Sequence, residues 1–281
     1  MSGELDLTGR IALVTGASGG IGSAICRLLA REVAGIALGY GRNAESADRL
    51  AAEIVSGGGT AQAFSSDMAD PGAPERLIDD VEAALGPVDI VVANHGLARP
   101  ARYEDVDAAV FDQTIAVNLR APFLLVRRAL PGMCERGFGR ILFISSVAAF
   151  RGGVIGPDYA SSKAGLHGLT HFLGNHVAAD GVTVNALAPG FIETAMLPGD
   201  PRQLAKATPI GRVGRPEEVA DLALAILRNG YITNQAFSID GGMYPAENRH
   251  SNPLSHPCRA NNVHKKISPA STVVRPYPHA A

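Results

Sequence analysis

The sequence predicts an α/β fold in which a doubly wound parallel sheet of about seven strands carries helices on both faces. Short apolar runs rich in β-branched residues recur along the chain, and longer segments with apolar residues at helical spacing separate them. Strand and helix in repeated alternation favour right-handed crossovers between parallel strands. Hydrophobic residues make up 46% of the 281 residues and charged residues 19%, a balance that can bury the core of one such domain.

The expected strands are short and apolar, as the buried strands of a parallel sheet are. Six of them are predicted at Ile11–Val14, Ile36–Leu38, Val88–Ala93, Ile141–Ile144, Val182–Leu187 and Ala236–Ile239. A further strand is expected before Asp67. Helices are predicted between the strands, among them Ala44–Ser56, which a run of glycines ends, and Pro157–Ala178. Asp70 and Arg215, each followed by proline, mark two further helix starts.

Charge and cysteine content exclude several classes of function. Lys and Arg number 25 against 27 Asp and Glu, a net charge of −2, so we expect neither nucleic acid nor a membrane surface as a partner. Cys26, Cys134 and Cys258 are too widely spaced for a disulfide framework or a zinc site, which favours a reducing, cytoplasmic location. No run reaches about 18 apolar residues, and the first residues lack a signal-peptide pattern.

The composition changes after residue 244. Residues 245–281 contain six prolines and four histidines, carry more basic than acidic side chains and have only scattered aliphatic residues. Such a segment cannot bury enough apolar surface to order itself. The sequence therefore predicts one folded domain over residues 1–244 and a flexible, basic, Pro/His-rich tail.

A glycine-rich turn follows the first strand directly. It reads Thr15-Gly-Ala-Ser-Gly-Gly-Ile-Gly22, and Ile21 opens an amphipathic helix. Glycines permit a tight turn and the close approach of a pyrophosphate, while the helix N-terminus offers free N–H groups and a positive dipole end. The spacing of Gly16, Gly20 and Gly22 differs from G-x-G-x-x-G. The turn predicts a Rossmann-type dinucleotide site, with a plain connector as the alternative.

From this turn onward the sequence resembles the short-chain dehydrogenase/reductase family, over about residues 5–244. The matching motifs follow the family's order and are Thr15–Gly22, Asp67, Asn94-His95-Gly96, Asn118, Ser146, Tyr159 with Lys163, and Pro189–Thr194. Within the family the chain is most similar to 3-oxoacyl-[acyl-carrier-protein] reductases, through Gly211–Glu218, Tyr231–Gln235 and Asp240–Met243. Tetrameric relatives share these stretches, so the resemblance implies a homotetramer.

Tyr159 and Lys163 form the centre of the predicted catalytic group. They lie four residues apart in a predicted helix and so share one helix face. A phenol has a reference pKa of about 10, and an adjacent ammonium favours the phenolate and suits the group to proton transfer. We expect Tyr159 to act as general acid and Lys163 to lower its pKa. The resemblance implies that the lysine also binds the ribose hydroxyls of the nicotinamide.

Ser146 and Asn118 complete the predicted catalytic residues. Ser146 follows the strand Ile141–Ile144 at its carboxyl end, where ligands bind in open α/β sheets, and its hydroxyl can orient a substrate carbonyl. Ser145 is the competing candidate, although the family spacing to Tyr159 favours Ser146. The resemblance implies that Asn118 holds a water in a proton relay to the lysine. The alternative for Asn118 is a polar residue at a helix kink.

The predicted cofactor site takes residues from the carboxyl ends of the strands. Its expected contacts are Gly16, Ser18, Gly20, Ile21, Gly22, Tyr40, Arg42, Asp67, Met68, Asn94, Gly96, Tyr159, Lys163, Pro189, Gly190, Ile192 and Thr194. The resemblance implies that Asp67 accepts from the adenine amino group and that Ile192 and Thr194 fix the carboxamide. Asp70 is an alternative to Asp67.

NADP(H) is the preferred cofactor in this interpretation. A site for NAD of this type offers a carboxylate at the end of the second strand, but the chain has Tyr40-Gly-Arg42 there. Arg42 could bind a ribose 2′-phosphate through two hydrogen bonds. Two points oppose this: Gly19 stands where many NADP-preferring relatives have a basic residue, and Arg42 could be a solvated charge at a helix start.

The sequence thus predicts an oxidoreductase that moves hydride between NADP(H) and a carbonyl or secondary alcohol. A 3-oxoacyl thioester is the first-choice substrate, a small non-thioester ketone or alcohol the second, and a non-catalytic dinucleotide-binding sensor the third reading. An acidic acyl carrier protein needs basic docking residues, yet Asp180 stands where carrier-dependent relatives have a cation, which leaves Arg136 and Arg140.

Three histidines need separate mention. His95 replaces the alanine of the family's Asn-Ala-Gly and could be structural, ligand-binding or simply tolerated. His167 and His171 have a spacing found in metal sites, but no third ligand is evident, so no metal is expected.

Overall fold

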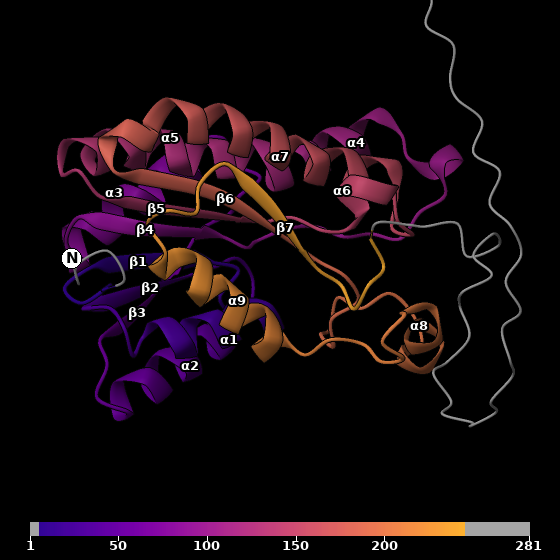
Figure 1. The fold of residues 1–281 in the computed structure, drawn as a ribbon, viewed down its shortest axis with the longest axis horizontal. Coiled ribbons are helices and arrows are strands. Elements are labelled where there is room, and N and C mark those ends of the chain that lie inside the picture. The colour runs from indigo at the N-terminus through magenta and orange to yellow at the C-terminus, as the bar shows by residue number, and fades with distance from the viewer. Residues whose placement is uncertain (1–5, 245–281) are drawn as a thin grey trace, which may run out of the picture. The chain divides into compact units, whose positions relative to one another are not determined.

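The computed structural model describes residues 6–244, which form one seven-stranded parallel sheet of order β3-β2-β1-β4-β5-β6-β7 (Figure 1). The strands are β1 (Ile11–Thr15), β2 (Gly35–Tyr40), β3 (Ala61–Ser65), β4 (Val88–Ala93), β5 (Gly139–Ile144), β6 (Val182–Pro189) and β7 (Gln235–Ile239). The predicted doubly wound fold with about seven strands is confirmed. The predicted tail, with Cys258, lies outside the described residues, so its flexibility stays a prediction.

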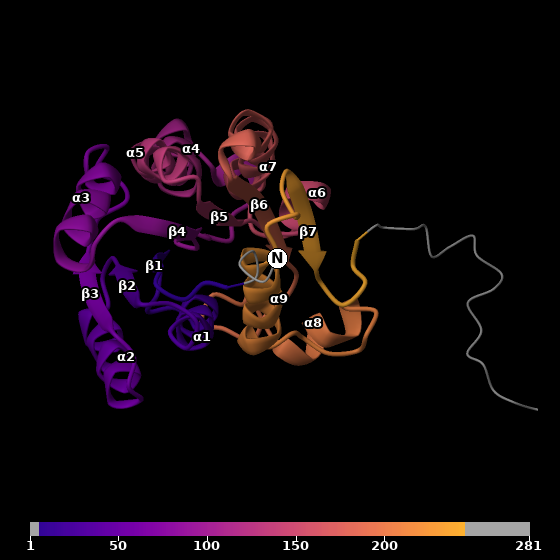
Figure 2. The same cartoon turned by 60° about the vertical axis from the view of Figure 1, so that its left-hand side comes forward.

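Helices cover both faces of the sheet (Figures 1 and 2). One face carries α1 (Gly20–Leu29), α2 (Ala44–Ser56) and α9 (Pro216–Arg228). The other carries α3 (Ala73–Leu85), α7 (Pro157–Val177) and a continuous stretch made of α4 (Ala108–Ile115), the π-helical turn η2 (Ala116–Arg120) and α5 (Ala121–Glu135). The remaining elements are short: η1 (Tyr103–Asp105), α6 (Ala148–Arg151), η3 (Ala178–Asp180) and α8 (Pro201–Ala207).

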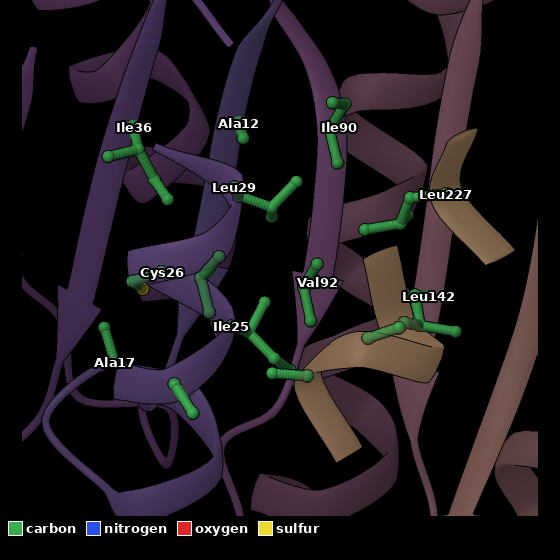
Figure 3. Close-up of a cluster of buried hydrophobic side chains, with 14 of the residues drawn as sticks. Ala12, Ala17, Ile25, Cys26, Leu29, Ile36, Ile90, Val92, Leu142 and Leu227 are labelled. Atoms are coloured by element: carbon green, nitrogen blue, oxygen red, sulfur yellow. The ribbon is translucent and has the colours of Figure 1, made fainter. Parts of the chain in front are cut away.

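The central strands are buried along their whole length because helices cover them on both sides. Figure 3 shows the aliphatic core on one face, where Ile25 and Leu29 of α1 lie close to Val92 of β4. Each fully buried side chain of this kind stabilises the fold by about 1.5–3 kcal/mol. This packing holds the N-terminus of α1 at the carboxyl end of β1.

Local signals explain most element boundaries. Helix α9 begins at Pro216 as predicted, and the carboxylate of Glu218 accepts from the Arg215 amide at 2.8 Å, which caps the first turn. Helix α3 begins at Ala73, later than predicted, because the Asp70 carboxylate accepts from the Gly72 amide and closes a turn before the helix. Strand β3 is an edge strand with no fully buried residue, so its sequence lacks an apolar run.

Among residues 6–244, one helix is long and apolar enough to cross a membrane by length and composition. It is the continuous stretch Ala108–Glu135, whose most apolar window of 18 residues has a mean hydropathy of 1.2, although polar residues interrupt its apolar run. Half of its apolar window is buried inside the domain, as in the core helix of a globular fold, so composition alone argues only weakly for a span. Cys26 and Cys134 are free thiols, and the cytoplasmic location stays a prediction.

Candidate functional site

The glycine turn between β1 and α1 has no room for a side chain at Gly16, Gly20 or Gly22. Gly16 has φ +64°, and a Cβ there would lie 2.9 Å from His95 Cα. A Cβ at Gly22 would lie 2.2 Å from the Gly16 carbonyl oxygen. The N-cap Gly19 provides no side-chain cap, so the first N–H groups of α1 stay available to a ligand. Backbone donors without covering side chains fit a pyrophosphate.

Asn94 holds this turn in place from the end of β4. Its side-chain amide donates to the carbonyl oxygens of Thr15 and Gly16, at 3.1 Å each. The Thr15 hydroxyl in turn accepts from the backbone N–H of Asn94 at 3.1 Å. Asn94 therefore supports the phosphate-binding turn through its side chain. Thr15 is fully buried, and the sequence reading did not single it out, because a threonine at a strand end gives no signal of its own.

The residues expected to bind the adenosine half lie at the ends of β2 and β3. The Ser66 amide donates to the Tyr40 carbonyl at 2.8 Å, which joins the two strand ends. Asp67 is exposed, and one carboxylate oxygen accepts from the Ala69 amide at 3.0 Å. Arg42 is exposed and, among residues 6–244, makes no hydrogen bond or ion pair. Its guanidinium is thus available to a ligand.

The segment after β6 crosses over the glycine turn. Gly190 donates to the Ile239 carbonyl at 2.9 Å, and a Cβ at Gly190 would lie 2.9 Å from Asp240 Cα. Ile192 is buried and pairs with Gly214 in an isolated bridge. Thr194 reaches the turn itself, since a Cβ at Gly20 would lie 2.7 Å from its methyl carbon. The structure therefore brings the predicted Pro189–Thr194 segment and the phosphate-binding turn together.

Helix α7 presents Tyr159 and Lys163 beside the end of β5. Lys163 is buried, and its ammonium donates to the Ile144 carbonyl at 2.8 Å. Its Nζ lies 5.8 Å from the centre of the Tyr159 ring. Burial lowers the pKa of Lys163 to about 8. Gly96 lies against the same ammonium, because a Cβ there would be 3.5 Å from Nζ.

The hydroxyls of Ser145 and Ser146 have different partners. Ser145 is buried and donates to the Lys163 carbonyl at 3.0 Å, and its oxygen lies 2.9 Å from Nε2 of His167. Ser146 makes a side-chain hydrogen bond to the phenol of Tyr159. Ser145 thus fastens α7 to the sheet, while Ser146 stands beside the reactive group that the sequence predicts.

The pKa of Tyr159 moves opposite to the sequence prediction. Burial raises it above its ordinary value, and the hydrogen bond from Ser146 opposes this rise only in part. Lys163 does not lower the pKa of Tyr159 here, because its ammonium is directed to the Ile144 carbonyl, away from hydrogen-bond reach of the phenol. The phenol therefore keeps its proton at neutral pH.

Asn118 lies in the π-helical turn η2, close to Tyr159 and Lys163. Its side-chain oxygen accepts from the Leu97 amide at 2.7 Å, and its amide donates to the Leu97 carbonyl at 2.9 Å. The same amide lies 3.1 Å from the Ser162 hydroxyl, which donates to the Tyr159 carbonyl at 2.7 Å. A Cβ built at Gly96 would lie 3.3 Å from the side-chain oxygen of Asn118 and 3.5 Å from Nζ of Lys163. The side chains of Asn118 and Lys163 therefore both lie next to Gly96. Ser162 is buried, and the sequence reading did not include it.

His95 is buried between this turn and β1. Its Nε2 lies 3.0 Å from the Val117 carbonyl, and its Nδ1 lies 2.6 Å from the Thr15 hydroxyl. Burial, and next the positive charge of Lys163, lower the pKa of His95 to about 3. The imidazole is therefore neutral throughout the physiological range.

The neutral imidazole predicts a loss of stability in acid. In the unfolded chain His95 binds a proton near pH 6.5, but in the folded chain only near pH 3, so its stabilisation is complete above pH 6.5 and is lost as the pH falls. From pH 7 to pH 5 this loss is about 2 kcal/mol. We expect His95→Gln to lose less stability than the wild type by that amount, measured by urea unfolding at both pH values. Equal losses in the two proteins would contradict the assignment.

Other predicted residues have structural partners. His171 lies 2.7 Å from the Asn234 side-chain oxygen, and with His167 bound to Ser145 the two rings serve separate contacts. Arg140 is 4% exposed and donates to the Leu227 carbonyl, and Arg136 pairs with the buried Asp89 at 3.1 Å. Arg140 is therefore too buried to dock a carrier protein, whereas Arg136 is paired but 30% exposed, so its role in docking stays a prediction.

Comparisons with known proteins identify the family of this chain. The family model for short chain dehydrogenase matches residues 10–204. The chain belongs to the short-chain dehydrogenase family. The acetoacetyl-CoA reductase of Cupriavidus necator is 34% identical to this short-chain dehydrogenase over 244 residues, which are 85% of the chain and 99% of the relative. The cis-4-hydroxycyclohexanecarboxylate dehydrogenase of Sinomonas cyclohexanicum is 37% identical over 241 residues, 83% of the chain and 96% of the relative.

Solved structures agree with these relatives. A 3-oxoacyl (acyl-carrier-protein) reductase from Agrobacterium tumefaciens C58 with NADP bound has a TM-score of 0.79 and 34% identity, and the alignment covers 86% of this chain and 98% of that one. This short-chain dehydrogenase is therefore an oxidoreductase of small molecules with a nicotinamide dinucleotide cofactor, and it resembles the 3-oxoacyl-[acyl-carrier-protein] reductases.

Proposed function

We propose that this protein is an NADP(H)-dependent reductase of 3-oxoacyl thioesters, with Tyr159 as general acid. The observation that carries the proposal is the meeting of Ser146, Tyr159, Lys163 and Asn118 beside a glycine turn that fits a pyrophosphate. A non-catalytic sensor has no need of this complete set of polar groups.

The bound nicotinamide would supply the hydride that reduces the carbonyl carbon. The phenol of Tyr159 then donates its proton to the carbonyl oxygen, and burial favours this direction because it keeps the phenol protonated at pH 7. The Ser146 hydroxyl orients the carbonyl and stabilises the phenolate that forms. Lys163, whose pKa is about 8, is mostly protonated at pH 7, and its ammonium would bind the ribose hydroxyls of the nicotinamide, as the family resemblance implies.

Asn118 acts in the return of a proton to Tyr159. Its own carbonyl lacks the usual helical donor four residues later, because that residue is Pro122. A carbonyl freed in this way can hold a water, and the water can pass a proton toward Lys163. Helical π turns of this kind are frequent at functional sites.

A coenzyme A thioester fits this chain better than a carrier-bound one. Relatives named for acetoacetyl-CoA and 3-oxoacyl carrier substrates both cover nearly the whole domain, yet Arg136 and Arg140 are engaged and Asp180 adds a negative charge. The second candidate is a non-thioester ketone or cyclic alcohol, which the relative from Sinomonas cyclohexanicum supports.

A substrate panel separates these candidates. We expect the kcat/KM for acetoacetyl-CoA, measured by NADPH oxidation, to be about 10⁴ M⁻¹s⁻¹ or more, the range common for enzymes. It should exceed the kcat/KM for acetoacetyl carrier protein, cyclic ketones or diketones by at least about 10-fold. Activity confined to non-thioesters would favour the second candidate. Cofactor binding with no turnover of any compound would favour the sensor.

The cofactor preference rests on Arg42, whose guanidinium has no partner within residues 6–244. We expect Arg42→Ala to raise the KM for NADPH by about 10-fold to 100-fold, because a charge-assisted contact to phosphate is lost, and to leave the KM for NADH within about threefold. Arg49→Ala is the matched control, since Arg49 pairs with Glu45 on the same helix. An equal change for both cofactors would count against 2′-phosphate recognition.

We also infer that the protein forms a homotetramer. Three exposed phenylalanines, Phe111, Phe123 and Phe172, lie on the neighbouring helices α4, α5 and α7, and burial against further copies would remove them from water. Light scattering measures the assembly directly, and a monomer would contradict it.

A further inference from the structure

His95 links two parts of the site, and the reaction requires that these parts keep fixed positions relative to one another. One part is the strand end that carries the phosphate-binding turn, and the other is the π turn that carries Asn118. The proposed mechanism gives His95 no proton to transfer and no ligand to bind. Its buried position and its two hydrogen bonds therefore call for a different explanation.

The hydrogen bonds of His95 define its tautomer. The Val117 carbonyl can only accept, so Nε2 carries the hydrogen and donates across 3.0 Å. Nδ1 is then the acceptor, and the Thr15 hydroxyl donates to it across 2.6 Å. The same hydroxyl oxygen accepts from the backbone amides of Asn94 and His95, at 3.1 Å and 3.4 Å, so its single proton and both lone pairs are used. The chain of bonds runs from Asn94 through Thr15 and His95 to Val117.

The Val117 carbonyl has neither of its helical donors. In an α-helix it would accept from Ala121, but the Ala121 amide donates to Ala116, five residues earlier. In a continued π-helix it would accept from residue 122, which is a proline and has no N–H. A buried carbonyl without a donor is costly. The imidazole N–H takes the place of the missing backbone donor.

We propose that His95 is a positioning residue that holds the π turn, and with it Asn118, in register with the phosphate-binding turn. Asn118 directly follows Val117, and its side chain bonds Leu97 and Ser162 from this turn. A turn fixed only by its own backbone would lack a donor at Val117 and could return to α-helical geometry, which would rotate Asn118. The inference rests on the proposed role of Asn118 in proton return.

Two amide substitutions test the bridge to Val117. Gln at residue 95 is long enough to place an N–H near the position of Nε2, whereas Asn reaches only the position of Nδ1, and His95→Ala removes both contacts. We expect amide hydrogen exchange in peptides from residues 114–123 to rise at least 10-fold in His95→Ala and His95→Asn and to stay within threefold of wild type in His95→Gln. With NADPH and acetoacetyl-CoA, kcat should follow the same order and fall about 10-fold to 100-fold without the bridge. The KM values and the Kd for NADPH should stay within threefold.

Val81→Ala is the control for lost stability, because Val81 is fully buried in α3, away from the bridge. This variant should lower the urea midpoint of unfolding. It should not raise the amide hydrogen exchange of residues 114–123 and should not change kcat. Equal exchange and equal kcat in His95→Gln and His95→Asn would overturn the proposal, and so would a joint loss of kcat and NADPH binding. If His95→Ala does not fold, the comparison of His95→Gln with His95→Asn still tests the proposal. A wild type that is inactive on acetoacetyl-CoA would count against the proposed function, while hydrogen exchange would still test the bridge.

Discussion

Replacing Tyr159 with Phe should lower kcat for carbonyl reduction by about 10²-fold to 10⁴-fold, the usual contribution of a positioned general acid. The phenol hydroxyl is the group that gives a proton to the carbonyl oxygen, and Phe keeps the ring and its packing while it removes that proton. The remaining polar groups, Ser146 and Lys163, would still orient substrate and cofactor. We therefore expect the Kd for NADPH, measured by fluorescence titration, to stay within about threefold.

The direction of the reaction gives this prediction a second readout. Because burial raises the pKa of Tyr159, the protonated form needed for reduction dominates at neutral pH, and the phenolate needed for alcohol oxidation forms only as the pH rises. Oxidation by the wild type should accelerate with pH, and the Phe variant should lose this dependence. Tyr231→Phe is the matched control, since that phenol is 96% exposed. Turnover by Tyr159→Phe within a few-fold of wild type would remove the proposed acid.

The fold could be predicted because buried parallel strands leave a direct signal. Strand β4 was predicted with the bounds that the structure has, since every residue of Val88–Ala93 is buried and all but Asp89 are apolar. Strand β3 gave no such signal, because an edge strand is covered only in part and polar residues interrupt its sequence. The end of the second strand was shortened in the prediction, because glycines at its ends carry no periodicity.

The site was less predictable than the fold. Spacing alone brought Tyr159 and Lys163 to one helix face, and order along the chain brought Ser146 to the same strand end. The pKa direction of Tyr159 could not be predicted, because it depends on burial and on where the Lys163 ammonium is directed. The sequence indicated the π turn only as a helix kink at Asn118, and the contact of His95 with the Val117 carbonyl could not be predicted because the two residues are far apart in sequence.

Replacing Gly22 with Ala should abolish cofactor binding. The added Cβ would lie 2.2 Å from the Gly16 carbonyl oxygen, 2.9 Å from the Gly16 carbonyl carbon and 2.7 Å from the side-chain amide nitrogen of Asn94, which holds the phosphate-binding turn. The Gly16 backbone cannot move aside as a flexible side chain can, so either the turn opens or α1 shifts away from β1. Either movement withdraws the N–H groups of α1 from the pyrophosphate. We expect the Kd for NADPH to rise by at least about 100-fold, the loss of a few charge-assisted hydrogen bonds.

The same clash should also be visible without cofactor. Overpacking of this kind costs about 1–3 kcal/mol, so the urea midpoint of Gly22→Ala should fall even in the free protein. Gly57→Ala makes the same chemical change at the end of α2, where the nearest atom to the added Cβ is the Ile54 carbonyl oxygen at 3.4 Å. That control should keep both NADPH affinity and stability close to wild type. If Gly22→Ala bound NADPH as tightly as the control, the close approach of α1 to the turn could not be what shapes the cofactor site, and the assignment of the glycine turn to the pyrophosphate would have to be abandoned.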